Sequence, residues 1–87
     1  MKEKEKVVSL FNIYPNPATS LLTVATNSCV GNEVFLDIFD MNGKQIIGEM
    51  LLDRGKNVID ISDFTKGIYV VKIRTTSEIE SRKLVVQ

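Results

Sequence analysis

Residues 33–40 read EVFLDIFD, and their apolar side chains recur at every second position. Val34, Leu36 and Ile38 fall on one face of an extended chain and Asp37 falls on the other, because successive side chains of a strand point to opposite faces. Helical spacing would instead place Asp37 inside the apolar arc. This segment is therefore predicted to be a β-strand with one buried face.

The same period of two recurs along the chain, in short stretches rich in Val, Ile, Phe and Thr that are separated by Gly, Asn, Asp or Ser. Seven strands are predicted, over residues 7–13, 21–26, 33–40, 44–52, 57–62, 68–75 and 82–87. Residues 44–52 are the least strand-like, because Gln, Glu, Met and Leu favour helices. Gly48 and the preceding Asn42-Gly43 pair nevertheless favour a hairpin there.

Seven short strands without crossover helices predict an all-β fold, a seven-stranded antiparallel immunoglobulin-like β-sandwich. Gly43 and Gly55 supply the positive φ values that tight turns require. The Cys pair and buried Trp of antibody domains are absent. The expected core consists of Leu22, Val24, Val34, Leu36, Ile38, Ile46, Ile59, Ile61, Phe64, Tyr69, Val71, Ile73, Leu84 and Val86.

The length and charge of the chain restrict its possible functions. Eighty-seven residues suit one domain, predicted over residues 7–87, with residues 1–6 as a charged linker remnant. The 11 basic and 11 acidic side chains cancel, so no net field attracts nucleic acid. No apolar run approaches the roughly 20 residues that span a bilayer, and the N-terminus lacks a signal peptide.

The residue types for enzyme chemistry are missing or unpaired. The chain has no histidine and one cysteine, Cys29, whose neighbours Ser28 and Val30 offer no cation to activate the thiol. A DMNGK stretch resembles the start of a calcium loop but lacks the later bidentate Glu. We expect no enzyme, no cofactor and no metal site. The carboxylates are interpreted as solvated faces and turn caps: Asp37, Asp40, Asp53, Asp60 and Asp63.

Two aromatic side chains, Phe35 and Phe39, are expected on the outward face of their strand. They form either a patch for a partner or a surface that neighbouring strands cover. The covered arrangement is favoured, because large exposed apolar patches are uncommon.

The segment YPNPATS, residues 14–20, contains both prolines of the chain. Each proline fixes its own φ and keeps the preceding residue out of the helical region. A rigid corner is predicted between the first two strands, with Asn16 capping the turn and Thr19 entering the next strand.

Four stretches, in this order and spacing, resemble the C-terminal sorting domain of the type IX secretion system of Bacteroidota (type A, Por secretion system family). They are NIYPNPATSLLTV, VFLDIFDMNGKQI, NVIDISDFTKGIYVVKI and RKLVVQ, and the resemblance runs from about Ile13 to Gln87. Gln87 stands where these domains commonly end in Lys or Arg. The signature positions implied by the resemblance are Tyr14, Pro15, Asn16, Pro17, Asp40, Gly43, Gly67, Tyr69, Lys83, Leu84, Val85, Val86 and Gln87.

The resemblance implies a secretion address that follows a cargo protein. The type IX outer-membrane translocon and its shuttle components would recognise it. A sortase-like surface peptidase would then cleave it, often joining the cargo to an anionic lipopolysaccharide, although some members are retained. The implied location is the periplasm in transit, then the outer-membrane surface or the extracellular space. A signal peptide would lie at the start of a longer precursor, and residues 1–6 would belong to the linker where cleavage occurs.

The final strand, Arg82 to Gln87, is expected at a sheet edge, where a receptor can add a strand of its own. Such an edge would also allow a strand-swapped dimer of the isolated domain. Pro15 and Pro17 are expected to shape the fold rather than to touch the translocon.

The alternative function is a non-catalytic carbohydrate-binding or fibronectin-like accessory sandwich. The absence of Trp and the presence of only 2 Tyr disfavour it, because sugar-stacking platforms rely on such rings. A spacer between domains is disfavoured because nothing follows Gln87.

Overall fold

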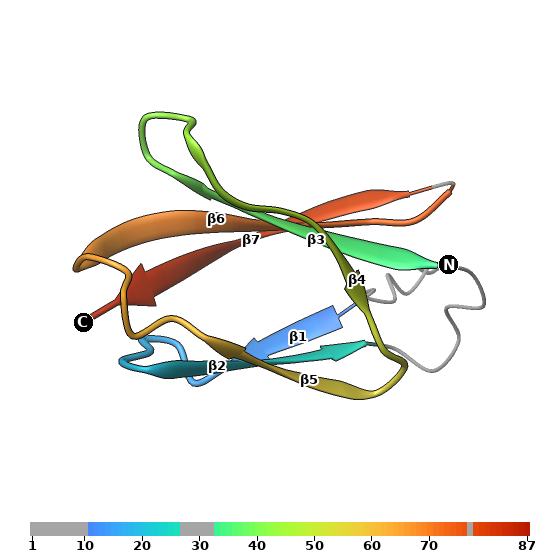
Figure 1. The fold of residues 1–87 in the computed structure, drawn as a ribbon, viewed down its shortest axis with the longest axis horizontal. Coiled ribbons are helices and arrows are strands. Elements are labelled where there is room, and N and C mark those ends of the chain that lie inside the picture. Colours follow the sequence, from blue (N-terminus) through green and yellow to red (C-terminus); the bar gives the residue numbers. More distant parts are fainter. Residues whose placement is uncertain (1–10, 27–32, 77) are drawn as a thin grey trace, which may run out of the picture.

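The computed structural model describes residues 11–26, 33–76 and 78–87, which form two β-sheets (Figure 1). The strands are β1 (Phe11–Tyr14), β2 (Leu21–Thr26), β3 (Val34–Asp40), β4 (Gln45–Leu52), β5 (Lys56–Asp60), β6 (Gly67–Arg74) and β7 (Ile79–Val86). In these ranges we find no helix with the length and apolar composition needed to cross a membrane. The predicted linker at residues 1–6 and Cys29 lie outside the described residues.

One sheet has the order β1-β2-β5 and the other the order β4-β3-β6-β7, and every neighbouring pair is antiparallel. Figure 1 shows the two sheets as separate layers. The predicted seven-stranded antiparallel β-sandwich is therefore confirmed.

The core lies between the two sheets and is built from the alternating side chains that the strand pattern predicts. Twelve of the predicted core residues are buried: Leu22, Val24, Val34, Leu36, Ile38, Ile59, Ile61, Tyr69, Val71, Ile73, Leu84 and Val86. Phe64 is only partly buried and packs against this cluster. Phe11, Ala18 and Leu52 are also buried, although the sequence pattern did not place them in the core.

The prediction that Ile46 belongs to the core is wrong, since its side chain is 38% exposed. The strand pairing gives the reason. Ile38 of β3 pairs with Ile47, whereas the next residue, Phe39, pairs with Gln45. Ile46 is thus the extra residue of a β-bulge, which interrupts the alternation of faces. Ile47 packs against the core instead.

The last strand begins three residues earlier than predicted, at Ile79. The reversal before it is tight: the Thr75 N–H donates to the Glu78 carbonyl over 2.8 Å, and the Glu78 N–H donates to Thr75 Oγ1 over 3.0 Å. Strands β6 and β7 pair from Gly67 opposite Val86 to Arg74 opposite Ile79.

A cation links the two sheets where β1 approaches β7. The Arg82 guanidinium lies 4.9 Å from the centre of the Phe11 ring, and its Nη2 donates to the Phe11 carbonyl over 3.1 Å. The same side chain pairs with Glu80. The first described strand is therefore attached to the last one across the sandwich.

Candidate functional site

The last strand, β7, lies at the edge of the four-stranded sheet, as the sequence predicts. Leu84 and Val86 are buried in the core, whereas Lys83 and Gln87 are exposed and Val85 is half-buried. The apolar side chains anchor the strand, and the alternate ones remain on the surface.

Residues 14–18, YPNPA, are called the corner below, and two of them, Asn16 and Ala18, form hydrogen bonds with this strand. The Asn16 side-chain amide bonds β7 with both of its polar atoms. Its Nδ2 donates to the Lys83 carbonyl over 2.8 Å, and its Oδ1 accepts a hydrogen bond from the Val85 N–H over 3.0 Å. The side-chain amide of Asn16, predicted to cap its own turn, thus forms hydrogen bonds with a segment 67 to 69 residues away in the chain.

Ala18 continues the same contact with its backbone. Its N–H donates to the Val85 carbonyl and its carbonyl accepts from the Gln87 N–H, both over 2.8 Å. Ala18 and Val86 form an isolated parallel β-bridge, and the Ala18 side chain is fully buried. The corner therefore covers the outer edge of β7 along residues 83–87 (Figure 1).

The remaining corner residues face solvent. Tyr14 is 42% exposed, and Pro15 and Pro17 are exposed as well. The Tyr14–Pro15 and Asn16–Pro17 peptide bonds are both cis. The signature residues of the corner thus lie on the surface, beside the signature residues of β7.

Two other signature residues support β7 from within the sheet. Gly67 pairs with Val86 and Tyr69 pairs with Leu84. The Tyr69 hydroxyl donates to the Thr65 carbonyl over 2.7 Å, an arrangement similar to the tyrosine corner of immunoglobulin-like sandwiches. The role of Tyr69 in this structure is to fix the start of β6.

The signature pair Asp40 and Gly43 lies elsewhere, in the hairpin between β3 and β4. The Asp40 carboxylate accepts hydrogen bonds of 2.9 Å from the N–H groups of Asn42 and Lys44. Gly43 has a φ of 86°, which favours glycine. The predicted turn cap at Asp40 is confirmed, and the structure does not bring this hairpin to the corner.

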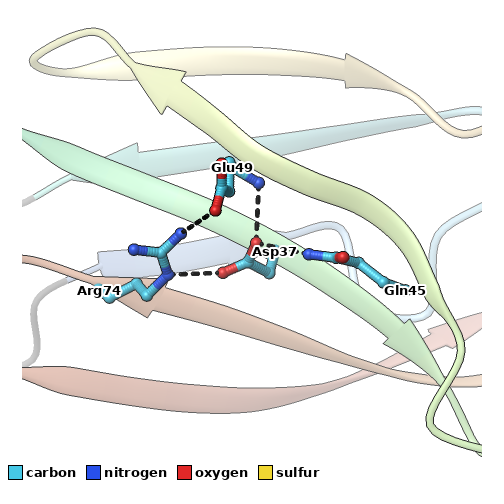
Figure 2. Close-up of polar contacts among 4 residues, drawn as sticks. All are labelled: Asp37, Gln45, Glu49 and Arg74. Carbon is cyan, nitrogen blue, oxygen red and sulfur yellow. Dashed lines mark hydrogen bonds and ion pairs between the residues drawn. The ribbon is translucent and has the colours of Figure 1, made fainter.

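The sequence pattern did not indicate one buried polar group. Asp37, interpreted from sequence as part of a solvated face, is only 3% exposed. Its Oδ1 accepts from the Glu49 N–H over 2.8 Å and from Gln45 Nε2 over 3.0 Å, and its Oδ2 accepts from Arg74 Nε over 2.9 Å (Figure 2). The carboxylate therefore joins β3 to β4 and β6.

The ionisation of Asp37 reflects two opposing effects. Burial disfavours the charged carboxylate, but the hydrogen bond from the Glu49 N–H, the hydrogen bond and charge of Arg74, and the hydrogen bond from Gln45 together outweigh this effect. The pKa of Asp37 is consequently lowered. The hydrogen bond that Asp37 accepts from the Glu49 N–H also holds Glu49 in a backbone conformation with a φ of 53°.

The aromatic residues on either side of Asp37 indicate how its burial could have been predicted from the sequence. Arg74 lies 5.3 Å from the centre of the Phe35 ring, and Lys72 lies 5.1 Å from the centre of the Phe39 ring. Both rings are half-buried, partly under cations of β6. A face expected to be covered at Phe35 and Phe39 would also bury the carboxylate between them.

Comparison with known proteins identifies the family. A family model described as a secretion system C-terminal sorting domain matches residues 12–87. No curated protein matches the chain. The matched range contains every signature residue of the corner, the β3–β4 hairpin, β6 and β7. Because this match covers nearly the whole chain, the protein belongs to the family of type IX secretion system C-terminal sorting domains.

Proposed function

We propose that this domain directs an attached cargo protein through the outer-membrane translocon of the type IX secretion system. The observation that carries this proposal is the family match over residues 12–87, since a sorting tail of this family is a signal read by that secretion machinery. The family is a non-catalytic one, so the domain acts by being recognised.

The same membership supports a proposal for the path of the cargo. The domain and its cargo cross the periplasm, where shuttle components engage them, and reach the outer-membrane surface or the extracellular space. There a sortase-like peptidase cleaves within or near residues 1–6 and joins the cargo to an anionic lipopolysaccharide, or the domain is retained. Residues 7–87 act as the sorting unit.

The surface proposed for recognition is the edge of the four-stranded sheet formed by β7, on which the corner lies. Lys83, Val85 and Gln87 point away from the core there, while Leu84 and Val86 hold the strand in place. The other signature residues, in the β3–β4 hairpin and β6, are assigned to the fold because their contacts are internal.

A reporter experiment tests the function. A signal peptide and a fluorescent or enzymatic reporter are fused before residues 1–87 and expressed in a Bacteroidota host with an active type IX system. We expect the reporter outside the outer membrane, and in the periplasm of a matched host that lacks the translocon. Periplasmic retention in the competent host would contradict the proposed function.

Removal of residues 83–87 sharpens the same experiment. Surface delivery of the shortened fusion is expected to fail, because the proposed recognition strand is gone. The deletion also removes the buried side chains of Leu84 and Val86, so a Lys83→Ala variant is measured beside it. Undiminished delivery of the deletion would exclude β7 as the recognised strand.

A further inference from the structure

We propose that the corner is a releasable cover of β7, and that the secretion receptor reads this strand by adding an extended segment of its own in place of the corner. This inference rests on the proposed function and names the mode of recognition. The occupant of the edge is therefore an extended protein segment, bound by β-strand addition.

A docking strand would need the backbone groups of β7 that point away from β6. The N–H and C=O of Val85 both do so, since both bond the corner. Backbone groups alternate in direction along a strand, so Lys83 and Gln87 present theirs on the same side. The Lys83 carbonyl, both Val85 groups and the Gln87 N–H are the groups that the corner occupies.

The corner is an irregular substitute for a strand. Pro17 has no N–H, so it cannot donate to an edge. Asn16 contributes a side-chain amide in place of backbone groups, and only Ala18 forms a bridge of strand type. An incoming strand can satisfy the same four groups with regular backbone bonds, so the exchange replaces hydrogen bonds one for one.

The exchange would disturb little buried surface. Pro15, Asn16 and Pro17 are exposed, and Ala18 is the only corner residue that is buried. Alanine is the smallest apolar side chain of the core, so its release uncovers little apolar surface. The bonds of the corner also stop at Lys83, and they do not hold Ser81 or Ile79 on the same side of β7.

A cover of this kind has a physical benefit before the receptor is met. An exposed edge strand pairs readily with other chains and promotes aggregation. Covering residues 83–87 during transit suppresses such pairing, and a weakly held cover leaves the strand available to a receptor.

A disulfide lock tests the release directly. Ala18→Cys and Val86→Cys are combined in a Cys29→Ser background, because bridged neighbours on adjacent strands lie about 4.8 Å apart, within the range that a disulfide spans. In the reporter fusion, we expect oxidation of the pair to lower surface delivery about tenfold or more, since a state that cannot open cannot bind. The two single-cysteine variants are the controls, and added reductant is expected to restore delivery.

The complementary variant opens the cover. Asn16→Ala removes the amide that bonds Lys83 and Val85, and Asn12→Ala is its matched control on β1. We expect Asn16→Ala to be delivered at least as well as the unchanged domain. In the isolated domain, we expect the Val85 amide to exchange its hydrogen about tenfold faster, while the Leu84 amide stays protected by β6.

Each result decides between defined outcomes. Normal delivery of the oxidised pair overturns the release, while the proposed function stands because the unchanged domain is exported. An Asn16→Ala protein that folds but is not delivered also overturns the proposed release, since the receptor would then recognise the corner itself. This second variant tests the release even where the two cysteines do not join. Failure of the unchanged domain to leave the periplasm identifies instead a failure of the proposed function.

Discussion

The four-stranded sheet has two edge strands, β4 and β7, and the chain protects them in different ways. Along β4, shifts in the pairing with β3 create bulges, and the buried carboxylate of Asp37 holds Glu49 in a left-handed backbone conformation. Along β7 the strand is regular, and the corner supplies the missing partners. Both devices prevent unwanted strand pairing, but only a cover can be exchanged for another strand.

The two edges therefore separate stability from recognition in this domain. The β4 edge depends on an internal polar cluster, so its disruption should cost folding free energy. The β7 edge depends on a surface contact, so its disruption should cost little stability and should change access to the strand. Substitutions at the β4 edge are therefore expected to lower the free energy of unfolding more than substitutions at the β7 edge.

The largest effect is expected for Asp37→Ala. This substitution leaves the Glu49 N–H and the Arg74 guanidinium without their buried acceptor, so we expect the free energy of unfolding to fall by about 2–4 kcal/mol. Urea denaturation measures it. Asp63→Ala, at an exposed position, is the control and should change stability by no more than about 0.5 kcal/mol. Equal stability of the two variants would show that the cluster does not hold the β4 edge.

The second prediction concerns pH. The pKa of Asp37 is lower in the folded protein than in the unfolded chain, so the unfolded chain binds the proton first as the pH falls. The contribution of this carboxylate is complete above the unfolded value of about 4 and is lost as the pH falls through the lower folded value. We expect the urea midpoint to decrease below pH ~4.

Asp37→Asn should flatten this acid dependence. Asp60 also has a lowered pKa, through hydrogen bonds with Ser62, and acts in the same direction from an exposed position. Asp60→Asn is therefore the matched control, and it should remove the smaller part of the slope because exposed pairs are screened by solvent. If the urea midpoint of Asp37→Asn fell with pH as steeply as that of the unchanged protein, Asp37 would not be the source of the acid dependence.

A smaller loss of folding stability is expected for Asn16→Ala, at the β7 edge. The two hydrogen bonds from Asn16 to β7 lie at the surface, where water can replace them, so we expect a loss of about 1 kcal/mol. The double variant with Asp37→Ala should show additive losses of stability, since Asp37 and Asn16 have no hydrogen-bond partner in common. Thermal or urea unfolding measures both values, and strong non-additivity would mean that the two edges are coupled.

The smallest effect is expected for Glu49→Gly. Glycine adopts a φ of 53° without the penalty that glutamate meets there, whereas the contact of Glu49 with Arg74, at 3.7 Å, is exposed and weak. We expect stability to change by no more than about 0.5 kcal/mol, with the bulge retained. Gly43→Ala, at a φ of 86°, is the contrasting variant and should destabilise by about 1 kcal/mol. A large loss in Glu49→Gly would show that its side chain carries the bulge.

Much of the architecture follows from local patterns. The alternation in residues 33–40 and 68–75 predicts strands with one buried face, and β3 and β6 have those faces in the structure. The turn residues Asp40 and Gly43 act as their chemistry predicts. These features could be predicted because they depend on side-chain period and backbone preference within a few residues.

The sequence-based predictions are wrong where segments that are distant in the chain meet. Ile46 is exposed because a bulge against β3 shifts the alternation, and no local signal in residues 44–52 sets that register. Asp37 is buried because Arg74 and Gln45 arrive from two other strands. A carboxylate on an outward face gives no local indication of such partners.

The amino-acid pattern was sufficient for the fold class, the edge position of the last strand and, through the order of its signature stretches, the family. The meeting of Asn16 with Lys83 and Val85 depends on the folded sandwich, which brings together residues 67 and 69 positions apart. Period and propensity describe one segment at a time, whereas the cover over β7 is a contact between two segments. Its geometry is set by how the two sheets pack, and neither segment alone contains it.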